Sequence, residues 1–265
     1  MPIDPTALRA RAAEIAVRLA VNPAECASAI HRLLDDYADR SHRYSPKLAE
    51  RTAPIPTFKT PPPVVRAILT ALRKPAQQAP AEALATAQYL WAKGSREERR
   101  IAVELLGLIA LRLPTETLAL IESWVPELES ATTANEVTEL ALSPLLPADP
   151  PGHLYRARQW LKQPNKWARY FGVMVIAALA KVRGWDDVPS ALDILRGLMT
   201  EPDPSVRQAV IAALNGLAPR NLNAMTRFLR EHAQRSNHHT HTILRATLKA
   251  LPAAEQTELV KMMRA

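Results

Sequence analysis

The 265-residue sequence has little cysteine and little glycine, and both shortages exclude classes of protein. The single cysteine, Cys26, excludes an intramolecular disulfide framework, CxxC redox chemistry and a zinc site built from several cysteines. The sequence has only seven glycines, compared with 23 prolines, and this number of glycines is too small for a fold that depends on tight strand turns. Neither a GxGxxG nor a GxxxxGK[ST] motif occurs, so dinucleotide and P-loop chemistry have no support. The sequence implies no metal and no cofactor.

Long hydrophobic runs and a secretory leader are also missing. The longest apolar run, residues 171–180, is too short to span a bilayer. The N-terminal residues lack the apolar segment of a signal peptide. We therefore expect a cytoplasmic protein, associated with the nucleoid if the source is bacterial, with no membrane partner.

Positive charge is unevenly distributed. Residues 1–150 carry 17 lysines and arginines against 18 acidic residues, whereas residues 151–265 carry 17 against 8. The whole formal excess of +8 therefore comes from the C-terminal part. Such a basic region indicates a polyanionic partner, most often nucleic acid, and the alternative is a solvated basic surface without a partner.

Helix signals run through the chain, and strand signals are nearly absent. Asp4, Asn22 and Asp203 each precede a proline, a pattern typical of an N-cap followed by the first helical residue. Ser95 and Glu98 have the spacing of a capping box. Apolar residues recur at helical spacing between these signals, for example at Ile101 and at positions 105 and 109. The sequence predicts an all-α protein of short helices.

A quasi-repeat of 31 to 38 residues emerges from the helices that open with an arginine. This length is typical of HEAT-like helix pairs, which stack into a curved superhelix (an αα solenoid) because one pair cannot bury its apolar face alone. The repeated arginines predict a basic ladder on the concave side, and the alternative is that they link neighbouring repeats structurally. The repeated positions are Arg66, Arg100, Thr138, Arg169, Arg207 and Arg245.

One predicted helix begins with an unusual cluster of cations and aromatics. Lys166, Trp167, Arg169 and Tyr170 lie within a turn and a half. A helix N-terminus favours phosphate, and an aromatic side chain there suits a sugar or base. The alternative is that Trp167 belongs to the core. His238, His239 and His241 have no spacing that suits a common metal site, so we expect them to be solvated or to face phosphate.

The chain resembles the AlkD-type DNA alkylation repair proteins, a superfamily of DNA glycosylases built from HEAT-like repeats. The resemblance covers about residues 54 to 251. It implies binding of double-stranded DNA, including damaged or distorted duplexes, and excision of N3- or N7-alkylated purines with the help of a carboxylate, aromatics and a phosphate-binding arginine. The motifs that carry the resemblance are residues 55–66, 89–91, 98–100, 165–169 and 206–210.

The residues that the family uses for catalysis are largely replaced. The family's central Trp-Asp-x-Val-Asp segment matches residues 134–138, with Ala134 at its tryptophan and Thr138 at its second aspartate. A later family tryptophan matches Ala212, and the phosphate-binding arginine matches Tyr170 or, with a one-residue shift, Arg169. Glu136 and Glu139 are the nearby carboxylates that would serve as catalytic substitutes if the register shifts.

The sequence thus predicts a monomeric DNA-binding protein that holds the DNA backbone in a basic concave groove. The alternatives are an active alkylpurine glycosylase with a relocated carboxylate and a protein-binding HEAT scaffold, so enzymatic activity stays open. We expect residues 1–50 to form an N-terminal helical cap and residues 51–265 to form a HEAT-like domain continuous with it. The predicted DNA-binding residues are Arg66, Arg99, Arg100, Lys166, Trp167, Arg169, Arg207 and Arg245.

Overall fold

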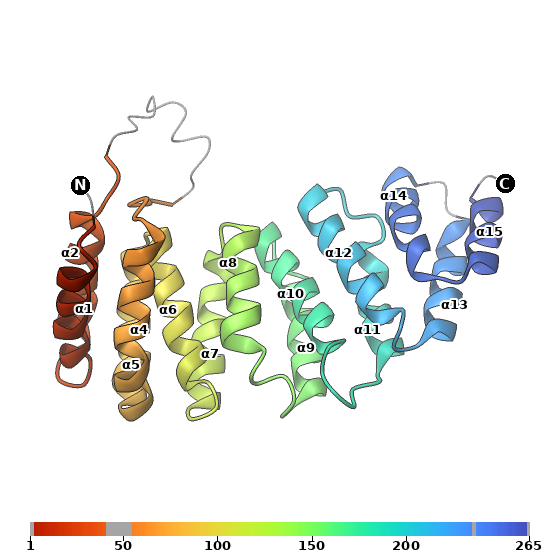
Figure 1. Ribbon diagram of the computed structural model, residues 1–265. Helices are drawn as coiled ribbons and strands as arrows, with labels where there is room; N and C mark the ends of the chain where they lie inside the picture. Colours follow the sequence, from red (N-terminus) through yellow and green to blue (C-terminus); the bar gives the residue numbers. More distant parts are fainter. Residues whose placement is uncertain (1–2, 41–54, 235–236, 264–265) are drawn as a thin grey trace. The chain divides into compact units, whose positions relative to one another are not determined.

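The computed structural model describes residues 3–40, 55–234 and 237–263, and these contain fourteen α-helices and no strand (Figure 1). The all-α class and the helical-repeat arrangement expected from the sequence are confirmed. The expected boundary between a cap and a repeat domain, at residues 50 and 51, lies outside the described residues and stays a prediction.

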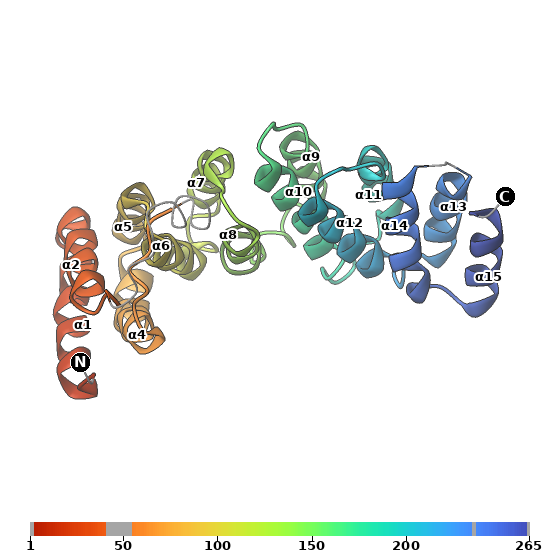
Figure 2. The same ribbon diagram turned by 90° about the horizontal axis from the view of Figure 1, so that it is seen from above.

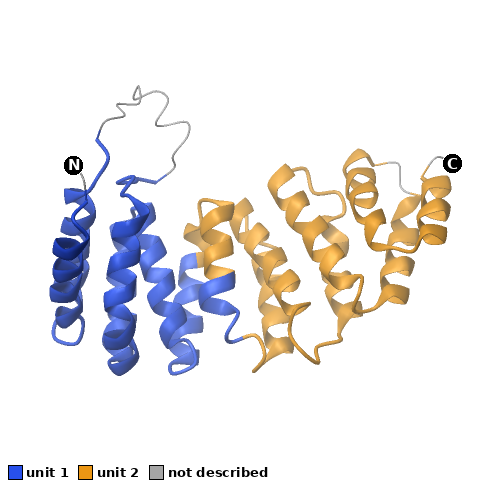
Figure 3. Cartoon of the chain, in the orientation of Figure 1, with its two compact units in different colours: residues 1–124, 139–145 blue, residues 125–138, 146–265 orange. Residues whose placement is uncertain are grey.

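The chain forms two compact units (Figure 3). Unit 1 comprises residues 1–124 and 139–145, and unit 2 comprises residues 125–138 and 146–265. The helices of unit 1 are α1 (Pro5–Leu19), α2 (Pro23–Asp36), α4 (Pro62–Gln78), α5 (Pro80–Lys93), α6 (Arg96–Ile109) and α7 (Pro114–Trp124). The helices of unit 2 are α8 (Ala131–Glu136), α9 (Pro150–Trp160), α10 (Lys166–Leu179), α11 (Val188–Leu195), α12 (Pro204–Leu217), α13 (Leu222–Ala233), α14 (His238–Thr247) and α15 (Ala253–Met262).

In unit 1, α4 packs between α1 and α6, while α5 packs against α2 and α6. The predicted apolar stripe of α6 is fully buried at Ile101, Leu105 and Ile109. Trp91 and Trp124 are also buried, and their rings stack 4.1 Å apart at an angle of 3°. The apolar faces of these helices are therefore buried against neighbouring helix pairs, as in other repeat proteins.

In unit 2, α10 packs against α8, α9 and α12, and α12 packs against α14. Helices α10, α12 and α14 lie in succession in both Figure 1 and Figure 2. Helix α13 packs against α11, α14 and α15, so it belongs to a second row. Unit 2 thus has two rows of helices, and α8, α10, α12 and α14 make up one of them.

The N-caps expected from the sequence are present. Asp4 Oδ1 accepts a hydrogen bond from the Thr6 amide at 2.9 Å, and Asp203 Oδ1 accepts one from the Ser205 amide at 2.8 Å. Ser95 and Glu98 complete the capping box of α6, with each side chain bonded to the other's amide. Since caps stabilise a helix by about 1 kcal/mol each, these local signals fix where the helices begin.

The expected repeat register needs a correction at two positions. Arg169 and Arg207 lie near the beginnings of α10 and α12, as predicted. Arg245 instead lies in the last turn of α14, so the prediction that it opens a helix is wrong. Thr138 lies in a π-helix, Val137–Leu142, that follows α8. The cause at Arg245 is the cap at Asn237, which starts α14 earlier than the arginine spacing suggested.

Gly107 of α6 permits the close approach of the π-helix backbone within unit 1. A Cβ atom placed on Gly107 would lie 2.3 Å from the Leu140 carbonyl oxygen. No such contact is tolerated by real side chains, so only glycine fits at this point of α6. A π-helix has more residues per turn than an α-helix, and such segments are often found at functional sites.

Cys26 is fully buried on α2, with its Sγ atom 3.6 Å from the Ile15 carbonyl oxygen. Burial raises the pKa of its thiol to about 12, so the reactive thiolate is nearly absent at neutral pH. We expect no reaction of the native protein with an aromatic disulfide reagent, and full reaction after unfolding in guanidinium. Rapid labelling of native protein would contradict the buried position.

Among the described residues, no helix is long and apolar enough to cross a membrane.

Candidate nucleic-acid interface

The beginning of α10 is held in place by its cap residue. Asn165 Oδ1 accepts a hydrogen bond from the Trp167 amide at 2.9 Å. The Asn165 amide group donates to the carbonyl oxygens of Pro126 and Leu128, at 3.0 and 2.8 Å. One side chain thus caps α10 and ties it to the loop before α8. This anchoring sets the positions of the cationic and aromatic residues that follow.

Trp167 is half-buried, whereas the other four tryptophans are buried. The Lys166 ammonium lies 4.6 Å from the centroid of its ring, within the range of a cation–π interaction. Tyr170 meets the same ring edge-on, with centroids 6.0 Å apart. Trp167 therefore packs on one side and leaves surface open to solvent beside a cation.

Two carboxylates of the next helix pair contact the cations of α10. Lys166 Nζ lies 3.3 Å from Asp203, and Arg169 Nη2 donates to the buried Glu201 at 3.2 Å. Partial burial raises the pKa of Asp203, but hydrogen bonds from the Val206 amide and Lys166 outweigh this and hold that pKa below its usual value. The Asp203 carboxylate is therefore negative at neutral pH and neutralises part of the basic cluster.

Arg169 and Arg207 occupy equivalent places in successive repeats. Arg169 Nη1 donates to the carbonyl oxygen of Pro164 at 3.0 Å, and Arg207 Nη1 donates to that of Glu201 at 3.1 Å and also to that of Pro202. In both cases an arginine near the N-terminus of a helix donates hydrogen bonds to backbone carbonyl oxygens of the loop that precedes that helix. The structural use of these arginines, one of the two alternatives open from the sequence, is thus visible at both positions. Each also keeps some exposed surface.

The other predicted cations are distributed over both units. In unit 1, Arg66 and Arg100 line one cleft between α4 and α6, and the Arg99 guanidinium lies 4.6 Å from the Trp91 ring. In unit 2, Arg245 is exposed, and its side chain makes no ion pair with the described residues. Only Lys166, Arg169 and Arg207 come together around one loop, at residues 201–203.

The positions that the sequence resemblance predicts to match the family's reaction centre differ in exposure. Ala134 is fully buried, and Thr138 is 1% exposed with its hydroxyl donating to the Ala134 carbonyl oxygen at 2.8 Å. Tyr170 is also buried, but Ala212 on α12 is exposed. A side chain at position 138 therefore lies within the protein and does not reach solvent.

Glu136 and Glu139, the two candidate catalytic carboxylates, lie in helices of different types. Glu136 is the last residue of α8 and is half-buried, whereas Glu139 is exposed in the π-helix. The i, i+3 spacing of an α-helix does not apply across this change of helix type. Each carboxylate therefore stays a candidate by itself.

Asn135 is a further residue of this region that the sequence did not single out. Its side-chain oxygen accepts a hydrogen bond from the Tyr170 hydroxyl at 3.1 Å, which links α8 to α10. The available signal was its place inside the segment 134–138 that matches the family's central motif. The carboxylates Glu201 and Asp203 were also missed, although Asp203 was recognised as a cap.

His238, His239 and His241 lie in the first turn of α14. The rings of His238 and His239 meet edge-on, with centroids 5.7 Å apart. Within the described ranges, no group of three or more histidine, cysteine, aspartate or glutamate side chains is arranged to hold a metal ion.

Comparison with known proteins adds one finding to this geometry. The family model described as DNA alkylation repair enzyme matches residues 37–251, which is most of the chain. A search of curated proteins finds no match. The matched range includes every helix from α4 to α14, with the cationic beginning of α10 and the loop at residues 201–203. By this match and its all-α repeat architecture, the chain belongs to the DNA alkylation repair enzyme family.

Proposed function

We propose that this protein is a DNA-binding member of the family that holds the phosphate backbone of duplex DNA with the basic side chains of unit 2. The observation that carries the proposal is the beginning of α10, where Lys166 lies over the half-buried ring of Trp167. The family match and the excess of positive charge in residues 151–265 support it. Cations at helix N-termini complement phosphate, and aromatics contact sugar and base.

The proposal extends to the loss of the family's usual catalytic residues. Position 138 holds a threonine, which carries no negative charge to stabilise a sugar cation. Position 134 holds an alanine, which has no ring to pack on deoxyribose. Both positions are buried, so neither side chain contacts a DNA substrate. Binding without base excision is therefore the activity that these residues favour.

Duplex binding measured by fluorescence anisotropy at two salt concentrations tests the proposal. Each phosphate contact releases condensed counterions, so about four contacts predict a roughly hundredfold loss of affinity between about 50 and 200 mM salt. The same loss is expected for unrelated duplex sequences, because phosphates carry no base information. Affinity that stays constant across this salt range would overturn backbone binding.

Arg245→Gln gives a residue-level version of the same test. Because Arg245 is exposed and unpaired among the described residues, its loss leaves the fold intact. We expect weaker binding for all duplexes and a salt slope reduced by about one. Arg227→Gln is the matched control, since Arg227 is exposed on α13, in the other row of helices. Equal effects of the two changes would contradict a site on the row with α14.

A base-release assay on methylated DNA separates this proposal from active excision. We expect no release of N7-methylated purine above background. Release that is lost in Glu136→Gln or Glu139→Gln would instead establish a glycosylase with a relocated carboxylate. Absence of duplex binding at both salt concentrations would favour a protein-binding scaffold. The ion pair between Arg169 and Glu201 would then serve to link successive repeats of that scaffold.

A further inference from the structure

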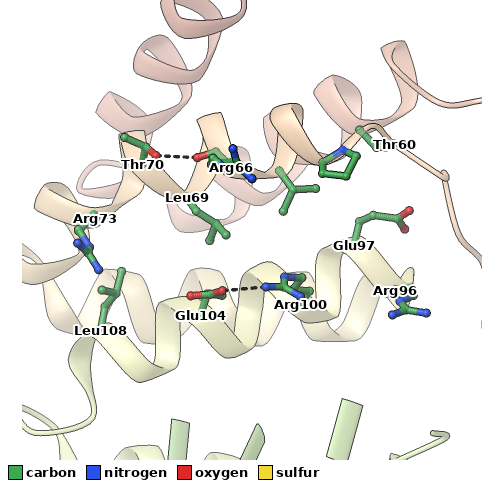
Figure 4. A pocket seen from close by; sticks show the side chains of 12 residues that line it. Thr60, Arg66, Leu69, Thr70, Arg73, Arg96, Glu97, Arg100, Glu104 and Leu108 are labelled. Atoms are coloured by element: carbon green, nitrogen blue, oxygen red, sulfur yellow. Dashed lines mark hydrogen bonds and ion pairs between the residues drawn. The ribbon is translucent and has the colours of Figure 1, made fainter. Parts of the chain in front are cut away.

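A cleft of about 690 Å³ lies between α4 and α6 in unit 1 (Figure 4). Its lining follows from helical spacing, because residues 96, 100, 104 and 108 lie on one face of α6. Residues 62, 66, 69 and 73 lie on the facing side of α4 in the same way. The volume is in the range of about 300 to 1,000 Å³ that small-molecule sites occupy.

Four guanidinium groups line this cleft. Arg66 and Arg73 come from α4, and Arg96 and Arg100 come from α6. Arg73 and Arg96 lie at its two ends, with Arg66 and Arg100 between them (Figure 4). The side chains of Arg66, Arg73 and Arg96 form no ion pair with the residues that the structure describes. Arginine offers planar, multidentate donors that suit phosphate and stack on aromatic planes.

Two carboxylates of the lining are engaged with the protein. Glu104 accepts a hydrogen bond from Arg100 at 3.3 Å. Glu97 accepts from the Thr57 hydroxyl at 2.8 Å and from the Phe58 amide at 3.2 Å. These bonds hold both carboxylates in position while leaving lone pairs for donors of a ligand. The cleft therefore has a positive excess but is not uniformly cationic.

Aliphatic side chains complete the lining. Val65, Leu69 and Leu108 line the cleft and are half-buried. Leu69 points from α4 toward α6 (Figure 4). A surface that binds only a phosphate backbone has no need of this apolar wall, and its two carboxylates would repel a dense row of phosphates. The combination fits a ligand that has one phosphate group, an apolar planar part and hydrogen-bond donors.

We propose that the cleft between α4 and α6 binds a single nucleotide, with its phosphate on the guanidinium group of Arg73 at one end and its base against the aliphatic wall. The amino group of the base donates to one of the two carboxylates, Glu97 or Glu104. The nucleotide is either free or part of a DNA strand, since both present the same chemistry. The site lies within unit 1 and does not depend on duplex binding by unit 2.

Titration calorimetry of the full-length protein with deoxyadenosine monophosphate tests this site. We expect binding of the mononucleotide and at least tenfold weaker binding of inorganic phosphate and of deoxyadenosine, each of which lacks half of the recognised groups. Arg73→Gln should weaken mononucleotide binding about tenfold, which corresponds to one lost charge-assisted hydrogen bond. Arg112→Gln is the control, because Arg112 is exposed outside the cleft of the same unit.

The Leu69→Ser variant separates the contribution of the aliphatic wall to binding from that of the guanidinium groups. It should weaken binding of the mononucleotide and leave that of inorganic phosphate unchanged. Displacement of the mononucleotide by a 5′-phosphorylated single strand would identify DNA as the source, and failure of displacement would identify free nucleotide. Equal affinity for phosphate and mononucleotide, equal effects of Arg73→Gln and Arg112→Gln, or no heat at millimolar mononucleotide would overturn the proposal. Duplex binding by the same variants, measured by fluorescence anisotropy, shows whether failure of the mononucleotide site is independent of the function proposed for unit 2.

Discussion

Replacing Gly107 with alanine is expected to lower the free energy of unfolding by about 2 to 3 kcal/mol. The added methyl group would lie 2.3 Å from the Leu140 carbonyl oxygen and 3.0 Å from its carbonyl carbon. Both are backbone atoms, so no side-chain rotation relieves the clash. Helix propensity alone predicts the opposite sign, because alanine in a helix interior is favoured over glycine by about 1 kcal/mol. Urea denaturation followed by circular dichroism measures the difference.

Gly216→Ala is the matched control for this prediction. Gly216 also lies in a helix, α12, but its added Cβ would meet only the Ala180 side chain at an ordinary 3.7 Å. We expect this change to leave the free energy of unfolding unchanged or to raise it by up to about 1 kcal/mol. If Gly107→Ala were as well tolerated as Gly216→Ala, the close approach of α6 and the π-helix would be wrong.

Replacing Thr138 with aspartate is expected to lower the free energy of unfolding at pH 7 by about 3 to 5 kcal/mol. Thr138 is 1% exposed, and its hydroxyl donates to the Ala134 carbonyl oxygen. A carboxylate at this position has no hydroxyl hydrogen to donate and is removed from water. The burial of an unpaired charge is the dominant cost.

The pH dependence of this variant follows from the same burial. Burial raises the pKa of the new carboxyl in the folded state above its unfolded value, so the folded protein binds more protons between the two pKa values. The stability of the variant relative to wild type therefore falls as pH rises through that window. We expect a smaller deficit at pH 4 than at pH 7, measured by urea denaturation at both values.

Thr138→Val serves as the control, because it keeps the shape and removes only the hydroxyl. Its expected cost is about 1 kcal/mol, independent of pH. Base release from methylated DNA should stay at background for Thr138→Asp, since position 138 does not reach solvent. A stable aspartate variant that releases alkylated bases would contradict the buried position and restore the family's reaction centre here.

The local features of this chain were readable from its sequence. The caps at Asp4, Ser95 and Asp203 were predicted because each depends on residues within three positions of one another. The burial of the stripe through Ile101 was predicted because helical spacing decides which side chains share a face. The family resemblance was likewise carried by short motifs in a fixed order.

The sites depended on contacts between distant residues. The predicted cluster at Lys166 and Arg169 exists, but its neutralisation by Glu201 and Asp203 joins residues more than 30 positions apart. The link from Tyr170 to Asn135 has the same character. Arg73 and Arg96 were not singled out at all, because only the packing of α4 against α6 brings them to one cleft.

The sequence by itself determined that this protein is an all-α repeat protein, where the helices capped by Asp4, Ser95 and Asp203 begin, and which family it resembles. These properties follow from capping, from the 3.6-residue period and from motif order, all of which are local. Only the tertiary structure decided that Thr138 is buried, that Gly107 must be glycine, and that Arg169 and Arg207 close their own loops. Burial and close approach depend on which helices pack together, and the apolar pattern of one helix does not specify its partner.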